Sequence, residues 1–319
     1  MEKHSERLTV TYMFPVQLIT LDNEHVSFSL EEINSCTYDH SVLCRIVGTL
    51  ENVFHGKHVE YLVCGDGALA IDSTYNFSTN DLLLHFNDCL CKLLLGGVSV
   101  ESISARDLTT GFKHANRSIW PVNFGHSYNS NMHACVRMRL ATPIETILLD
   151  GAASSSHTIS ELTECHSKGN AILQHLTNMS TYHLISGITE LRYSNWSSAV
   201  THLWIVTEQL TDFLWERDFI ECSTRDPLIP SRKQTLRQDH RTYSASVKQE
   251  FLYQINVIPT NTYTILYTIR KSRNKLIHEG RMATEEDAKS LYAAVNDLLR
   301  IATSSTTACI LPEVFPYRC

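Results

Sequence analysis

The sequence has no long apolar run. No stretch approaches the roughly 18 consecutive apolar residues that a membrane-spanning helix needs. The N-terminal residues 1–7 are mostly polar and lead into alternating residues, whereas a secretory leader has an apolar core. We therefore expect a cytoplasmic protein with no membrane partner.

Recognisable metal and redox motifs are also missing. Among ten cysteines only Cys89 and Cys91 lie close together, and a C-x-C pair is neither a zinc knuckle nor a redox motif. His55 and His58 are the nearest approach to a metal-binding pair, but no cysteine or carboxylate ligand set stands beside them. We interpret them as surface histidines and predict no metal site and no cofactor.

The chain also lacks a phosphate-binding loop, a G-x-G-x-x-G motif, an internal repeat and an excess of positive charge. Its net charge of -7 argues against a general nucleic-acid coat protein. The charge is unevenly spread, because residues 223–281 hold eleven basic and four acidic side chains. This stretch indicates a local anion-binding site, or alternatively a solvated loop and helix face.

Residues 1–150 are typical of a mixed, strand-rich domain. Alternating or short apolar runs predict strands at 8–13, 16–21, 42–50, 58–64, 68–71 and 135–140. One helix interrupts them, with Ser78 as its cap, Asp81 three residues later and Gly96-Gly97 as its end. A loop rich in His, Asn and Ser is expected at about 112–133. The small residues 151–156 suggest a linker.

Residues 157–303 predict an all-helical domain, followed by an irregular tail at 304–319. Helical spacing favours helices at 159–179, 181–193, from 196 onward and at 245–257, with a basic loop at 222–240. Asn261 or Thr262 is expected to cap the next helix, which Gly280 ends. Thr284 caps the last helix, with Asp287 at its third position. The fold class is therefore α+β.

The segment 270–280, RKSRNKLIHEG, is the most informative part of the chain. It places a guanidinium (Arg273), an amide (Asn274) and an imidazole (His278) near the end of a helix. Arginine can hold a phosphate through its planar fork of donors, and histidine can move a proton near neutral pH. These side chains together suggest chemistry on a phosphodiester.

This arrangement resembles the HEPN superfamily, whose motif is Arg-(Asn/Asp/His)-x-x-x…His near the end of a helical bundle. The resemblance covers roughly residues 157–303 and does not extend to residues 1–150. Gly280 stands where a subset of the family has tyrosine two residues after the histidine, which removes a nucleotide-modification target. Many HEPN proteins are metal-independent endoribonucleases of toxin–antitoxin, anti-phage or CRISPR-associated systems, and others only bind or assemble.

The resemblance implies a catalytic set of Arg273, Asn274 and His278. His278 would act as general acid and base while the RNA 2′-hydroxyl attacks the adjacent phosphate, and Arg273 would stabilise the developing charge. Asn274 would orient His278 or donate to a phosphate oxygen. It further implies an antitoxin or regulatory partner, with residues 1–150 sensing a trigger or restraining the nuclease.

Helix geometry adds a constraint on this site. Residues five apart lie about 140° apart around an ideal helix, so one helix cannot easily aim Arg273 and His278 at one phosphate. Either the last turn is distorted or two chains share a composite site, so we expect a two-fold homodimer. The remaining RNA-binding candidates are basic side chains of the same region: Arg232, Lys233, Arg237, Arg241, Arg270, Lys271 and Lys275.

Each of these assignments has a purely structural alternative. Arg273 could pair with an acid such as Glu279, and His278 could serve only as a helix cap. Tyr243 could stack a base or lie in a solvated loop. Trp196, Trp204 and Trp215 are interpreted as core or interface residues. For the whole protein, the alternatives are a non-catalytic HEPN scaffold that binds nucleotide, RNA or a defence protein, and an unrelated helical interaction module.

Overall fold

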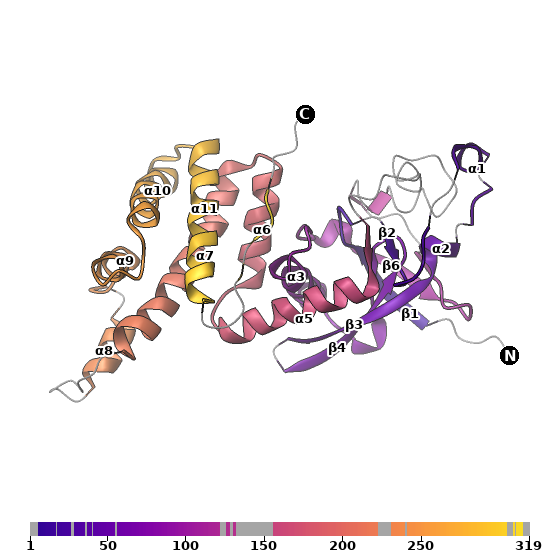
Figure 1. Cartoon of the computed structure of the whole chain (residues 1–319), viewed down its shortest axis with the longest axis horizontal. Coiled ribbons are helices and arrows are strands. Elements are labelled where there is room, and N and C mark those ends of the chain that lie inside the picture. Colours follow the sequence, from indigo (N-terminus) through magenta and orange to yellow (C-terminus); the bar gives the residue numbers. More distant parts are fainter. Residues whose placement is uncertain are drawn as a thin grey trace. The chain divides into compact units, whose positions relative to one another are not determined.

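The computed structural model describes residues 6–314, apart from 17, 27–28, 36, 40, 55, 122–125, 128–129, 132–155, 223–230, 240, 305–308 and 310. The chain divides into two compact units, Met1–Ser167 and Lys168–Cys319. The first contains the sheet and the second is helical, which confirms a mixed α+β chain (Figure 1). The strand expected at 135–140 lies outside the described residues, as do residues 151–155 of the linker expected at 151–156. Ser156 instead begins a short strand, Ser156–Thr158, so helical structure starts at Ile159 and not at 157.

The first unit is built on a six-stranded sheet in which every neighbouring pair is antiparallel. β1 lies between β5 and β6, and Leu8 is paired with Asp72 on one side and Gly111 on the other. A Cβ on Gly111 would lie 2.8 Å from the Val10 side chain, so a larger residue there would crowd β1. In spatial order the strands are β3 (Ile46–Phe54), β4 (Lys57–Cys64), β5 (Ala68–Asp72), β1 (Glu6–Tyr12), β6 (Thr109–Lys113) and β7 (Ile119–Pro121).

Smaller elements surround this sheet, and two sequence predictions are corrected here. The strand expected at 42–50 begins only at Ile46, because the residues before it form a helical turn whose Leu43 and Cys44 are buried. The loop expected at 112–133 contains β7, whose pairing with β6 satisfies its backbone. Strand β2 (Leu18–Thr20) pairs in parallel with β8 (Ser156–Thr158). The remaining elements are α1 (Leu30–Asn34), α2 (Ser41–Cys44), η1 (Ser73–Tyr75) and η2 (Ala105–Asp107).

Helix α3 (Thr79–Leu95) supplies much of the core of the first unit. Ser78 and Asp81 form the predicted capping box, and almost all side chains from position 85 onward are buried. Its buried face also carries charge: Lys92 lies 2.9 Å from Asp88, which accepts a hydrogen bond from Asn52 of β3. Both charged side chains are only 3% exposed, so this polar cluster lies inside the core.

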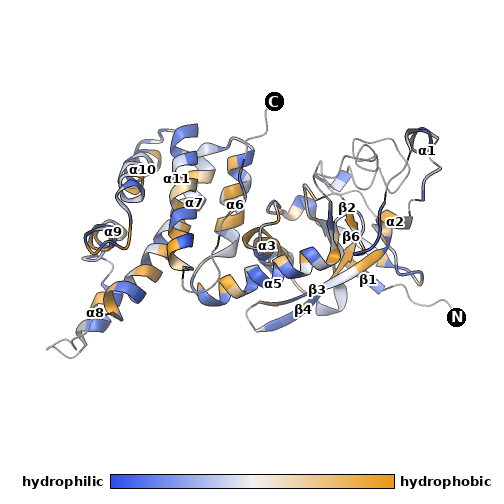
Figure 2. Cartoon of the chain, in the orientation of Figure 1, coloured by the Kyte–Doolittle hydropathy of each residue, from blue (hydrophilic) through white to orange (hydrophobic). Residues whose placement is uncertain are grey.

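The second unit is a bundle in which α7 packs against both α6 and α11, and α10 packs on α11. The apolar side chains of α11 at 288, 291, 295, 298 and 302 are all buried, as their spacing predicts. Figure 2 shows hydrophilic and hydrophobic residues alternating along α5, which begins in the first unit. The helices are α5 (Ile159–His175), α6 (Thr181–Arg192), α7 (Trp196–Leu214), α8 (Arg232–Gln238), α9 (Ala245–Gln254), α10 (Thr260–Glu279) and α11 (Glu285–Ala302).

The structure differs from three local sequence predictions in this unit. The basic stretch expected to be a loop contains the short helix α8. Helix α10 begins at Thr260, directly after Pro259, with no side-chain cap; the Thr262 hydroxyl instead donates to Asp297 of α11 at 2.8 Å. Helix α7 continues into η5 (Trp215–Ile220), a π-helix, which the spacing of apolar residues does not reveal.

Within the described part of the chain, none of the helices combines the length and apolar character needed to cross a bilayer.

Candidate functional site

The motif lies at the C-terminal end of α10, where two local signals fix the chain. Gly280 adopts a left-handed conformation (φ 68°) and its N–H donates to the carbonyl of Lys275, which ends the helix. Thr284 and Asp287 then form the predicted capping box of α11. Asp287 also accepts a hydrogen bond from Ser272 of α10 at 2.8 Å. The last turn of α10 is therefore held against the first turn of α11.

The three candidate catalytic side chains differ in their surroundings. Arg273 is half-buried, and its Nη1 lies 3.5 Å from the Asn274 side-chain oxygen, at the limit of a hydrogen bond. Asn274 and His278 are exposed. Among the described residues, no hydrogen bond or ion pair joins Arg273 to His278, and Arg273 forms no ion pair with Glu279. One chain therefore does not bring the guanidinium and the imidazole together.

The RNA-binding candidates fall into two groups. Arg270 and Lys271 flank the exposed ring of Tyr267, with their charges 5.4 and 4.2 Å from its centroid. Their charge lowers the pKa of Tyr267, chiefly through the hydrogen bond with Lys271. Lys275 is exposed on the same helix. Arg270 and Lys271 thus add positive charge to α10 within about one turn of Arg273.

The second group lies on and after α8. Arg237 binds Glu216 (Nε to Oε1, 2.8 Å) and also contacts Glu221, so its charge is already neutralised. Lys233 is half-buried, Arg241 is exposed, and only the backbone of Arg232 is described. The ring of Tyr243 is 5.8 Å from that of Trp215, which places this base-stacking candidate in an aromatic cluster.

The tryptophans mostly belong to the core. Trp204 and Trp215 are each 2% exposed, as the sequence interpretation expects, whereas Trp196 is half-buried. The Trp215 indole stacks on Phe219 with centroids 4.0 Å apart.

Exposed apolar side chains surround the end of the bundle that carries His278. Ile277 is 51% exposed and Met282 71% exposed. The Met282 sulfur lies 3.7 Å from the hydroxyl of Ser197, in the first turn of α7. Tyr193, at the preceding α6–α7 turn, is 46% exposed. We call Tyr193, Ile277 and Met282 the apolar end. Apolar groups left open beside a polar motif are typical of an interaction surface.

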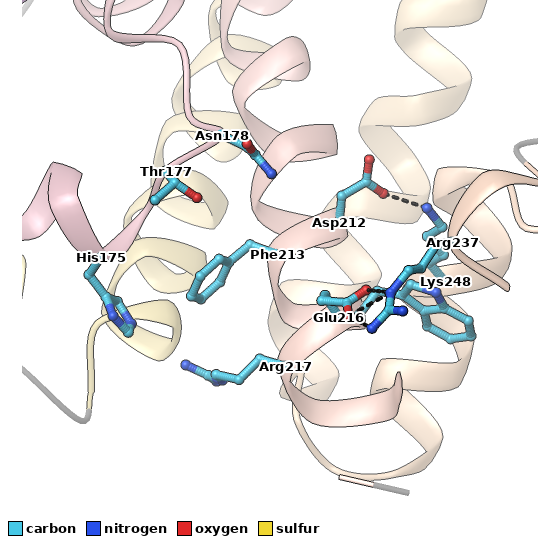
Figure 3. Close-up of a pocket in the computed structure, with 10 residues that line it drawn as sticks. His175, Thr177, Asn178, Asp212, Phe213, Glu216, Arg217, Arg237 and Lys248 are labelled. Carbon is cyan, nitrogen blue, oxygen red and sulfur yellow. Dashed lines mark hydrogen bonds and ion pairs between the residues drawn. The ribbon is translucent and has the colours of Figure 1, made fainter. Parts of the chain in front are cut away.

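A pocket of about 580 Å³ lies elsewhere in the helical unit, at the junction of α7 and η5 (Figure 3). Lys248 of α9 and Asp212 of α7 form an ion pair at 2.6 Å on one side of it. On another side Arg217 donates to the carbonyl of Ala302 at 2.8 Å, at the end of α11. Its lining consists of His175, Thr177, Asn178, Asp212, Phe213, Trp215, Glu216, Arg217, Arg237 and Lys248.

Sequence reasoning missed this pocket, since its residues come from four segments without a shared motif. Only the position of Arg237 in the basic stretch gives a partial signal. The pocket is also remote from the motif. It adjoins Ala302, the last residue of α11, whereas His278 comes shortly before Glu285, the first residue of that helix. The 18 residues of α11 span about 27 Å.

No cluster of three or more metal-ligating side chains occurs in the part of the chain that the structure describes. Comparisons with known proteins add no assignment: no family model, curated protein or solved structure matches this chain.

Proposed function

We propose that the chain is a metal-independent endoribonuclease of the HEPN type that acts as a growth-arrest or anti-phage effector. The observation that carries the proposal is His278, an exposed imidazole without a described partner, at the end of a helix that also carries the cations Arg270, Lys271 and Lys275. An imidazole held only as a helix cap would have a partner among the terminal carbonyls, and the described residues show none.

The chemistry proposed for this site needs a proton shuttle and a fixed positive charge. His278 removes the proton of the RNA 2′-hydroxyl, the O2′–P bond forms and the P–O5′ bond breaks. The departing O5′ takes up a proton, which leaves a 2′,3′-cyclic phosphate and a 5′-hydroxyl. The guanidinium of Arg273 stabilises the charge that develops on the phosphate oxygens.

The proposal includes a second copy of the chain. Because Arg273 and His278 diverge on α10, Arg273 of one protomer would act with His278 of its partner. The apolar end, beside His278, is the surface through which the copies would associate. Burying the exposed parts of these three apolar side chains would favour association.

The direct test is cleavage of mixed-sequence RNA in EDTA by the wild type, by His278→Ala and by His58→Ala. His58 is an exposed histidine of the first unit, so its variant controls for loss of a surface imidazole. We expect His278→Ala alone to abolish cleavage and the product to carry a 2′,3′-cyclic phosphate. Cleavage that survives in His278→Ala contradicts the proposal.

The second candidate is a non-catalytic scaffold of the same type that binds RNA, nucleotide or a defence partner. It is favoured by the separation of Arg273 and His278 within one chain, together with the exposed apolar end. Expression in bacteria separates the two candidates. A nuclease arrests growth in a manner that His278→Ala relieves, whereas a scaffold gives equal growth with both proteins.

A further inference from the structure

The pocket at the α7–η5 junction has the size of a small-molecule site. Its volume of about 580 Å³ falls within the range of roughly 300–1,000 Å³ that is typical of such sites. Figure 3 shows Thr177 and Asn178 on one side and the Asp212–Lys248 pair on the other, with Phe213 between them. All of its lining residues belong to the helical unit.

Fixed charges around the pocket are already balanced. Lys248 pairs with Asp212 at 2.6 Å, Arg217 with Asp218 at 2.7 Å, and Arg237 with Glu216. The lining itself holds three cations and two carboxylates, since Asp218 does not line the pocket. Because Asp218 and Glu221, just outside the lining, complete these pairs, a guest would be held by hydrogen bonds and not by an uncompensated positive charge.

Unused hydrogen-bond donors lie around the pocket, which favours a guest that supplies acceptors. Trp215 is 2% exposed, and its Nε1–H has no partner among the described residues. Lys248 is 3% exposed, and its ammonium uses one of three N–H groups, for Asp212. Thr177 and Asn178 form no described hydrogen bond. A buried donor such as Trp215 Nε1 destabilises the protein while it lacks an acceptor, and an acceptor-rich guest would relieve this cost.

The walls are aromatic. The Phe213 ring is contacted at its edge by His175, with centroids 5.2 Å apart, and has the Arg217 guanidinium 5.6 Å from its centroid. The π-helix η5 begins at Trp215, and such helices occur frequently at functional sites. A guest with a flat apolar part would pack against the half-buried Phe213 ring.

We propose that this pocket binds a small organic anion, consisting of a carboxylate or phosphate group on a planar aromatic body. The anionic oxygens would accept hydrogen bonds from Trp215 Nε1, Lys248 Nζ and the side-chain amide of Asn178, and the aromatic body would lie against Phe213. Because the pocket is about 27 Å along α11 from the motif, this is a separate site and does not depend on the proposed nuclease activity.

Binding to the full-length protein tests the proposal by titration calorimetry with benzoate, phenyl phosphate, inorganic phosphate and the neutral analogue benzamide. We expect one of the two aromatic anions to bind at a single site, more tightly than inorganic phosphate and than benzamide. The preferred anion identifies the acidic group. Absence of binding by both aromatic anions, or equal binding of benzamide, overturns the proposal.

Three variants locate the site. Trp215→Phe removes the N–H but keeps a ring, Lys248→Met removes the charge, and Asn178→Ala removes an exposed amide. Each is expected to weaken binding about 3–10-fold, since one hydrogen bond contributes about 0.5–1.5 kcal/mol. Trp196→Phe and Lys289→Met are the matched controls and should bind as the wild type does.

Asn178→Ala keeps the test valid if the two buried substitutions prevent folding, because position 178 is exposed. Unchanged affinity in Asn178→Ala and in every other folded variant would place the anion elsewhere and overturn the proposal.

Discussion

Arg273 and His278 leave the same helix in different directions. They lie five residues apart on α10, which corresponds to about 140° around the helix axis. The Arg273 guanidinium lies beside the Asn274 amide, while His278 is exposed at the last turn. The proposed site, shared by two copies of the chain, would make use of this divergence.

The apolar end should determine the oligomeric state. Ile277→Glu places a carboxylate in the proposed dimer contact, where burying an unpaired charge is costly. We expect this variant to sediment as a monomer at concentrations where the wild type is dimeric. Ile255→Glu, at the residue after α9, is the matched control, because Ile255 is 42% exposed and lies outside the apolar end. Equal sedimentation of the two variants would argue against this interface.

The cations of α10 should govern how strongly RNA binding depends on salt. Lys275 has no described ion pair, so its ammonium is available to a phosphate. Lys275→Ala is expected to reduce the slope of log K against log salt by about 0.7, the value for one contact with a single strand. Lys289→Ala should leave the slope unchanged, because Lys289 already pairs with Glu285 at 2.5 Å. Fluorescence anisotropy with labelled RNA in a salt series gives both slopes.

Close packing of α6 on α7 depends on Gly187. A Cβ at this position would lie 2.8 Å from Leu203 Cγ, inside ordinary van der Waals contact. Gly187→Ala should therefore destabilise the protein by about 1–3 kcal/mol, despite the higher helix propensity of alanine. Urea unfolding in a Leu203→Ala background provides the check, because removing the crowding side chain should reduce that cost. An equal cost in both backgrounds would show that crowding by Leu203 is not the cause.

Stability should fall in mild acid because of His166. Burial, with a further contribution from the Lys92 ammonium, lowers the pKa of His166 to about 4 from its ordinary value of 6.5. Between these two pKa values the unfolded chain binds a proton at His166 and the folded chain does not. The free energy of unfolding is therefore unaffected by His166 above pH 6.5 and falls as the pH is lowered towards 4. The loss amounts to roughly 3 kcal/mol, at 1.36 kcal/mol for each pH unit.

Unfolding of the wild type and of His166→Gln at pH 7 and pH 4.5 isolates this contribution. The free energy of unfolding should drop further in the wild type than in the variant, because glutamine does not titrate. A drop of equal size in both proteins would remove His166 as the cause.

Local signals in the sequence predicted much of the helical framework, because they act over a few residues. Ser78 with Asp81 and Thr284 with Asp287 form capping boxes from neighbours three positions apart, and Gly280 ends its helix alone. Features that depend on distant segments were not predictable in this way. The Lys248–Asp212 pair joins residues 36 positions apart, so the pocket has no sequence signature.

The motif illustrates the same limit. Sequence places Arg273, Asn274 and His278 at the end of one helix. Asn274 and His278 are exposed because the apolar face of α10 turns towards α11, whereas Arg273 is half-buried. Which side chain meets which across a second copy depends on an interface, and no periodicity within one chain encodes that arrangement.

Mixing two inactive variants tests the composite site most directly. Arg273→Ala and His278→Ala proteins are each expected to lack RNA cleavage in EDTA, and mixing them allows their subunits to exchange. A mixed dimer would retain one intact pair, with Arg273 from one protomer and His278 from its partner. The account predicts that cleavage returns on mixing, whereas a mixture that stays inactive although mixed dimers form would contradict it.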